Sequence, residues 1–319
     1  MTTATLPSPA ARPLAPKQIR QIIALTVGAV VLFIGGRLIP TGTDLHRTDF
    51  DVAGGGAGDR VIEFCDPANP QFLPVVAMRS PVTMSLAPDA PLRAGEEARF
   101  TLRLATASGK PIAPVDLLVA HTRKLHLMVV DPTLDDYHHI HPEPGETPGE
   151  WIFAVTPREG GIYRVFADFT PTVTARGLYA SADFTVPSAA DAAAPAIGHQ
   201  KNDTYEADGL RFTLRPDAAP IRSREQARLT FTVERSDGGA VGLEPVMDAY
   251  AHLVAFDESR SGFAHLHPEQ VDLDVPPDAL RPTLTFRITI PEPGSYVIWA
   301  QVNVRGEERY APFWFEVAP

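Results

Sequence analysis

The chain has 319 residues, 44% of them hydrophobic, with a formal net charge of −11 and a single cysteine, Cys65. This length allows two domains of ordinary size, each with its own core. The acidic balance disfavours nucleic acid and anionic membrane surfaces as partners, and one cysteine excludes an intrachain disulfide. We expect Cys65 to be inert, which leaves no thiolate for a blue copper site.

The N-terminal region predicts a membrane anchor. Residues 1–20 carry basic but no acidic side chains, and we interpret them as a cytoplasmic tail. Segment 21–40 is almost wholly apolar, close to the ~20 residues that span a bilayer. A cleaved signal peptide is the alternative, but no small-residue cleavage site follows Gly36. The remainder is then periplasmic or extracellular, on a bacterial inner membrane crossed once.

The rest of the chain predicts two similar domains. Residues 41–80 are expected to be a tether that could add a strand, 81–187 a first domain, 188–203 an Ala- and Pro-rich linker, and 204–319 a second domain. Alternating apolar runs such as Phe100-Leu102-Leu104, separated by Gly- and Pro-rich turns, are typical of strands. The expected fold class is all-β, with two tandem immunoglobulin- or cupredoxin-like antiparallel sandwiches after a transmembrane helix.

One histidine-rich segment occurs twice at the same spacing. His126 precedes His139 by 13 residues, as His252 precedes His265, and each copy ends in His-x-His-Pro. Each copy predicts a β-hairpin. We assume a register in which Met128 faces His139 in the first copy, so that the numbers of paired residues add up to 267. The same register pairs Val254 with His265 in the second copy. Alternation then places the histidines on one face of each hairpin.

Three imidazoles on one face of a hairpin are a typical ligand set for copper or zinc. The candidate metal ligands are His126, His139, His141 and Met128 in the first copy, His252, His265 and His267 in the second, and His121 and Met247 as axial ligands from the preceding loops. A thioether would favour Cu(I) at the first site. Asp257 and Glu269 could orient a histidine. His138, His46 and His199 are expected to be solvated.

The motifs around His126-Leu127, His139-x-His141-Pro142 and Gly161-x-Tyr163, and their second copies, resemble those of YtkA-like and FixH-like bacterial domains. The resemblance spans about 82–186 and 210–317. It implies membrane-anchored or secreted β-sandwiches suspected of copper or other heavy-metal handling. Leu125 and Ala251 stand where that pattern has glycine, a departure that affects strand packing more than the histidines.

Three functions are weighed. The first is a membrane-anchored periplasmic metal-binding protein, with copper as the expected ion and zinc as the alternative, acting in delivery, buffering or resistance. The second is a non-catalytic module that binds an envelope protein and uses its histidines structurally. The third, a metal-dependent enzyme, is disfavoured because no additional general base is evident near the histidines, and we expect no catalytic residues.

Overall fold

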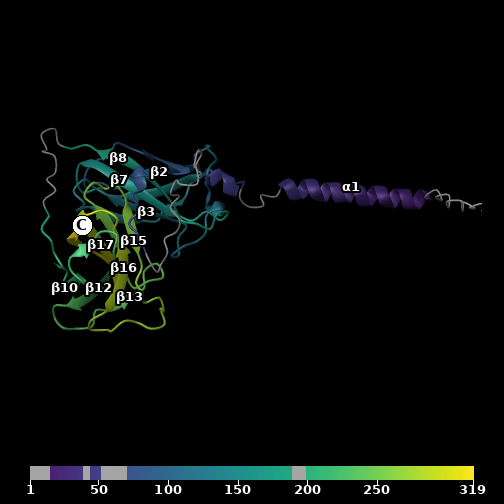
Figure 1. Cartoon of the computed structure of the whole chain (residues 1–319). Coiled ribbons are helices and arrows are strands. Elements are labelled where there is room, and N and C mark those ends of the chain that lie inside the picture. The colour runs from purple at the N-terminus through teal and green to yellow at the C-terminus, as the bar shows by residue number, and fades with distance from the viewer. Residues whose placement is uncertain (1–14, 39–43, 52–69, 189–198) are drawn as a thin grey trace, which may run out of the picture. The chain divides into compact units, whose positions relative to one another are not determined.

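The computed structural model describes residues 15–38, 44–51, 70–188 and 199–319. Helix α1 (Pro16–Leu38) belongs to a unit separate from residues 44–319 (Figure 1). Cys65, most of the predicted tail and tether, and most of the predicted linker lie outside the described residues. Leu25 and Leu32 of α1 are exposed. Within the described part of the chain, no helix has the length and apolar character that a membrane crossing needs, so the anchor stays a prediction.

The first domain is a sandwich of two four-stranded antiparallel sheets. The sheet orders are β1-β2-β6-β5 and β4-β3-β7-β8. The strands are β1 (Val82–Pro88), β2 (Ala98–Thr106), β3 (Leu125–Val130), β4 (Tyr137–Ile140), β5 (Glu143–Pro144), β6 (Glu150–Val155), β7 (Gly161–Phe169) and β8 (Leu178–Val186). Buried Phe100, Leu102 and Leu104 alternate along β2, which confirms the predicted half-buried strand.

The second domain repeats this architecture. Its sheets have the orders β16-β12-β10-β9 and β11-β18-β17-β14-β15, with β13 paired to β17. The strands are β9 (Thr204–Ala207), β10 (Leu210–Pro216), β11 (Ile221–Arg222), β12 (Gln226–Arg235), β13 (Leu243–Glu244), β14 (His252–Asp257), β15 (Phe263–Leu266), β16 (Thr283–Thr289), β17 (Gly294–Val304) and β18 (Glu307–Ala318). The two-sandwich prediction is confirmed, with one departure from antiparallel pairing, because β11 and β18 are parallel. The immunoglobulin-like or cupredoxin-like name stays a prediction.

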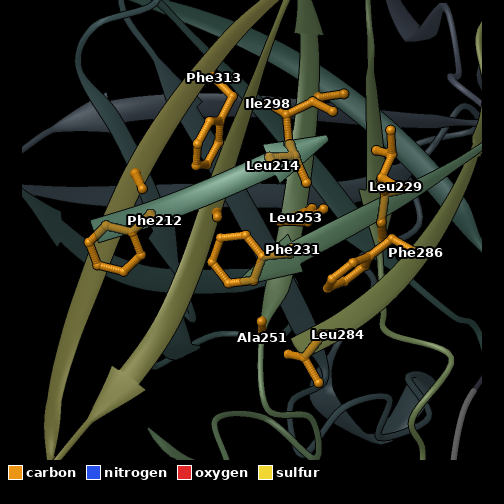
Figure 2. Close-up of a cluster of buried hydrophobic side chains, with 14 of the residues drawn as sticks. Phe212, Leu214, Leu229, Phe231, Ala251, Leu253, Leu284, Phe286, Ile298 and Phe313 are labelled. Atoms are coloured by element: carbon orange, nitrogen blue, oxygen red, sulfur yellow. The ribbon is translucent and has the colours of Figure 1, made fainter. Parts of the chain in front are cut away.

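Each sandwich is held by its own apolar core. In the second, Phe212, Phe231, Leu253, Phe286 and Phe313 meet between the two sheets (Figure 2). These aromatic side chains come from strands of both sheets. Full burial of one such side chain contributes about 1.5–3 kcal/mol, so the core alone fixes which face of each strand points inward.

A third apolar cluster joins the two sandwiches. Met128 and Phe166 of the first sandwich pack with Val254, Phe256 and Phe263 of the second. The sheets containing β3 and β14 therefore face each other, and both strands are covered on both sides. This explains why every residue of β3 is buried, with no polar-out alternation.

The segment before β1 also contacts the second sandwich. Phe72 lies in that domain's core, and Leu73 forms an antiparallel bridge with Phe263. Earlier, Leu45 and Phe50 pack into the core of the first sandwich. The described parts of the predicted tether are therefore anchored by buried side chains, with isolated bridges in place of a regular extra strand.

Candidate metal centre

The two histidine hairpins have the predicted register. Met128 pairs with His139 between β3 and β4, and Val254 pairs with His265 between β14 and β15. Because side chains alternate along a strand, the histidines share the face opposite Leu127 and Leu253, which point into the domain cores. Both copies therefore present imidazoles toward the facing sandwich.

The first triad consists of His126, His139 and His141. His126 Nδ1 lies 3.3 Å from His139 Nε2 and 3.2 Å from His141 Nε2. With metal–nitrogen bonds of about 2.0–2.1 Å, tetrahedral ligand nitrogens lie about 3.3 Å apart. Both distances from His126 Nδ1 thus match the spacing of ligands around one ion, and all three nitrogens lie within 4.8 Å of one another.

The second triad consists of His252, His265 and His267, whose ligand atoms also lie within 4.8 Å of one another. The equivalent nitrogens are His252 Nδ1, His265 Nε2 and His267 Nε2. All three are buried without a hydrogen-bond partner among the described residues. Leaving a buried polar atom unpaired costs about 1–3 kcal/mol, and a cation bound by all three would remove that cost.

Backbone carbonyls fix the tautomer of the first histidine in each triad. His126 Nε2 donates to Ala120 O at 3.0 Å, and His252 Nε2 donates to Val246 O at 2.9 Å. Since a carbonyl only accepts, the proton is on Nε2 and the lone pair is on Nδ1. Each Nδ1 lone pair points into its triad, as a metal ligand requires.

The second histidine of each triad is oriented from the opposite sandwich. His139 Nδ1 donates to Gln301 Oε1 at 2.8 Å, and His265 Nδ1 lies 3.4 Å from Asp168 Oδ2. Gln301 in turn donates from Nε2 to Glu308 at 2.9 Å, which fixes its amide with the oxygen toward His139. His139 Nε2 therefore has a lone pair that faces the lone pair of His126 Nδ1, a repulsive contact that a metal ion would convert into two bonds.

The two triads are neighbours. The ring centroid of His265 lies 5.6 Å from that of His126 and 5.2 Å from that of His139, and the centroids of His139 and His252 are 6.2 Å apart. Centroid separations within each triad are similar, at 4.8–5.5 Å. Six imidazoles thus form one cluster between the two sandwiches.

Burial keeps the triads neutral. Desolvation lowers the pKa of His126 and of His252 to about 4, and that of His141 to about 3. Burial, followed by the neighbouring imidazoles, lowers the pKa of His139 and of His265 well below its usual range, and the pKa of His267 shifts in the same direction. Neutral imidazole is the form that binds a metal, and all six triad histidines are in this form at neutral pH.

His121 lies at the second triad, although it was predicted as an axial ligand from the loop that precedes the first hairpin. Its ring stacks on that of His267 with centroids 3.7 Å apart, while its centroid is 6.2 Å from that of His126. His121 and its counterpart Met247 both have φ 49°, an uncommon backbone for a residue other than glycine. The loop of the first sandwich thus turns toward the ligands of the second.

The other predicted ligands and orienting groups lie elsewhere. Met128 is fully buried in the apolar cluster between the sandwiches. Asp257 accepts from Ser261 N within its own turn, and Glu269 forms ion pairs with Arg228 and Arg287. Neither carboxylate orients a triad histidine, so this part of the prediction is wrong.

Two histidines outside the triads have partners. His138 forms an ion pair with Asp136 at 2.9 Å and is half-buried. His199 stacks on Trp314 with centroids 3.8 Å apart and bonds to Thr133 O at 3.1 Å. The expectation that these side chains are solvated is wrong, because they join segments of the protein. His46 is exposed as predicted.

A cavity of about 810 Å³ lies beside the cluster. Its lining includes His126 of the first triad, His265 and His267 of the second, His121 and Asp168. The cavity therefore gives a route by which an ion could reach the buried nitrogens.

Sequence reasoning missed Asp168 and Gln301. A signal existed, because Asp168 and Gln301 each lie seven residues after the glycine that begins β7 or β17, and each follows three apolar residues. Their register opposite His126 and His252 places them on the histidine face. What the sequence lacked was the pairing of the two sandwiches, which brings each polar residue to the other domain's histidine.

Family comparison reproduces the duplication. The model described as "Domain of unknown function (DUF8832)" matches residues 77–189 and again 205–319. The chain belongs to this family. The match supports two tandem copies of one domain, while the YtkA-like and FixH-like name stays a resemblance. No curated protein matches.

Solved structures give only distant likenesses to this DUF8832 protein. A DUF4785 family protein from Legionella pneumophila is 9% identical with a TM-score of 0.24, over 74% of this chain and 47% of that one. A putative membrane anchored protein from Corynebacterium diphtheriae is 9% identical with a TM-score of 0.23, over 76% and 60%. This chain thus spans about half to three fifths of these two proteins.

Proposed function

We propose that this protein binds two metal ions through its paired histidine triads, with copper as the principal ion and zinc as the alternative. The observation that supports this most directly is the set of buried imidazole nitrogens, including three in the second triad that have no hydrogen-bond partner among the described residues. Histidines retained for structure alone would have both nitrogens paired.

The type of ligand favours copper or zinc over hard cations. Each triad offers three neutral nitrogens, which suit copper and zinc, whereas magnesium and calcium prefer oxygen. A three-histidine set also leaves a coordination position open, which permits ion exchange. We therefore propose delivery, buffering or resistance as the role, on a protein anchored to the bacterial inner membrane with its sandwiches outside the cytoplasm, as the resemblance to YtkA-like and FixH-like domains suggests.

The test is a competition titration of the purified protein with Cu(I), Cu(II) and Zn(II). We expect two equivalents per chain for the wild type. The double substitution His139→Ala/His141→Ala should remove one equivalent, and His265→Ala/His267→Ala should remove the other. His138→Ala is the matched control. His138 is next to His139 on β4, but it belongs to neither triad and its imidazole pairs with Asp136.

Unchanged stoichiometry in both double variants would refute the assignment of these ligands. Binding no tighter than that of a surface histidine pair would refute the function as a whole. The histidines would then be structural, and a non-catalytic module that binds an envelope protein would become the leading hypothesis.

A further inference from the structure

The two triads differ in the group that orients their central histidine. Asp168 and Gln301 occupy equivalent positions, opposite His126 and His252 in register. Each reaches across to the other sandwich, where Asp168 approaches His265 and Gln301 binds His139. One site therefore has a carboxylate behind its histidine, and the other has a neutral amide.

This difference changes the electrostatics of each site. A carboxylate that accepts the Nδ1 proton makes the imidazole a stronger donor and compensates part of the charge of a divalent ion. An amide oxygen fixes the ring orientation without a formal charge. Glu308 lies behind Gln301, but it accepts from the Gln301 amide and from the Tyr310 hydroxyl, so it does not bond to the His139 ring itself.

The loop before the first hairpin also distinguishes the two sites. His121 lies against the second triad, stacked on His267. Its counterpart in the other sandwich is Met247, with the same φ of 49°. Imidazole suits copper and zinc. The repeats therefore also differ at this position, where the first sandwich adds an imidazole beside the second triad.

We propose that the two sites prefer different metal charges: the His252/His265/His267 site, oriented by Asp168, favours a divalent ion, Cu(II) or Zn(II), and the His126/His139/His141 site, oriented by Gln301, favours Cu(I). This inference rests on the proposed function, because both triads must bind metal. It assigns Asp168 and Gln301 as positioning residues and not as ligands.

The test uses the two near-isosteric substitutions Asp168→Asn and Gln301→Glu in the full-length protein. Zn(II) and Cu(I) affinities are measured by competition titration, and ¹⁵N-histidine NMR reports which triad each ion occupies. We expect Asp168→Asn to weaken Zn(II) binding at the second site about 10–100-fold and to leave Cu(I) at the first site unchanged. Gln301→Glu should strengthen Zn(II) at the first site and reduce its preference for Cu(I).

His121→Asn gives a second measurement that leaves Asp168 and Gln301 unchanged. His121→Asn should weaken Zn(II) at the second site alone. The proposal is overturned if substoichiometric Zn(II) fills the first triad, or if Asp168→Asn changes Zn(II) and Cu(I) affinities equally. If the wild-type protein binds neither ion at either triad, the proposed function itself fails.

Discussion

His139 of the first sandwich donates a 2.8 Å hydrogen bond to Gln301 of the second, 162 residues further along the chain. His265 and Asp168 form the reciprocal contact in the opposite direction. Each triad therefore depends on both domains, and the metal binding that we propose would be coupled to the way the two sandwiches pack. The stability of the interface and the affinity of the sites should change together.

Acid should destabilise the metal-free protein from about pH 6.5 downward. The folded-state pKa values of His126 and His252 are about 4, below their unfolded value of 6.5. The unfolded chain then binds more protons between these values, so stability falls as pH falls, by up to about 1.4 kcal/mol per pH unit for each histidine. Burial raises the pKa of Asp168 to about 7 in the metal-free protein, which opposes this trend by more than one histidine supports it but by less than the two histidines together. Urea unfolding between pH 4 and 7.5 measures the slope, and a flat profile would contradict the buried neutral triads.

Metal binding should stabilise the fold. An ion that binds only the folded state adds about 2.7 kcal/mol per site at 100 times its dissociation constant. We expect the melting temperature of the chelator-treated protein to rise on addition of Cu(I) or Zn(II). The rise should be smaller in the His265→Ala/His267→Ala variant, which retains one triad. Equal shifts in wild type and in this variant would indicate binding elsewhere.

Trp299 should contribute to the contact between the sandwiches. Its Nε1 donates to Leu134 O at 3.0 Å, and its ring packs on Tyr137 with centroids 5.7 Å apart. Trp299→Ala should cost about 3–5 kcal/mol of unfolding free energy. Trp299→Phe retains an aromatic ring and loses the hydrogen bond, and should cost about 1–3 kcal/mol. Denaturant unfolding of both variants separates the contribution of the ring from that of the hydrogen bond. Equal losses of unfolding free energy in the two variants would show that the hydrogen bond dominates.

Gly262 should be intolerant of a side chain. A Cβ at this position would lie 1.7 Å from Leu73 O, in the segment that bridges to Phe263. Gly262→Ala should therefore displace residues 70–77 from the second sandwich and increase proteolysis there. Ser261→Ala is the control, since it leaves the bond from Val76 N to Ser261 O intact. Equal protection of the two variants from protease would contradict this packing.

The sequence determined the hairpins and their histidine triads. A separation of 13 residues and a two-residue side-chain period place His126, His139 and His141 on one face, and duplication repeats the set at His252, His265 and His267. These are local relations within one hairpin, so short-range periodicity is enough to predict them. The register that followed from this pattern is the one observed.

Only the tertiary structure decided how the two hairpins combine. The two inner sheets pack against each other through apolar side chains such as Phe166 and Phe256. From the sequence, an apolar residue of a domain core cannot be distinguished from one of a domain interface. That packing brings the triads together, places His121 at the second site and aligns Asp168 and Gln301 with the opposite histidines. Such contacts join residues about 100 or more positions apart, and no local period encodes them.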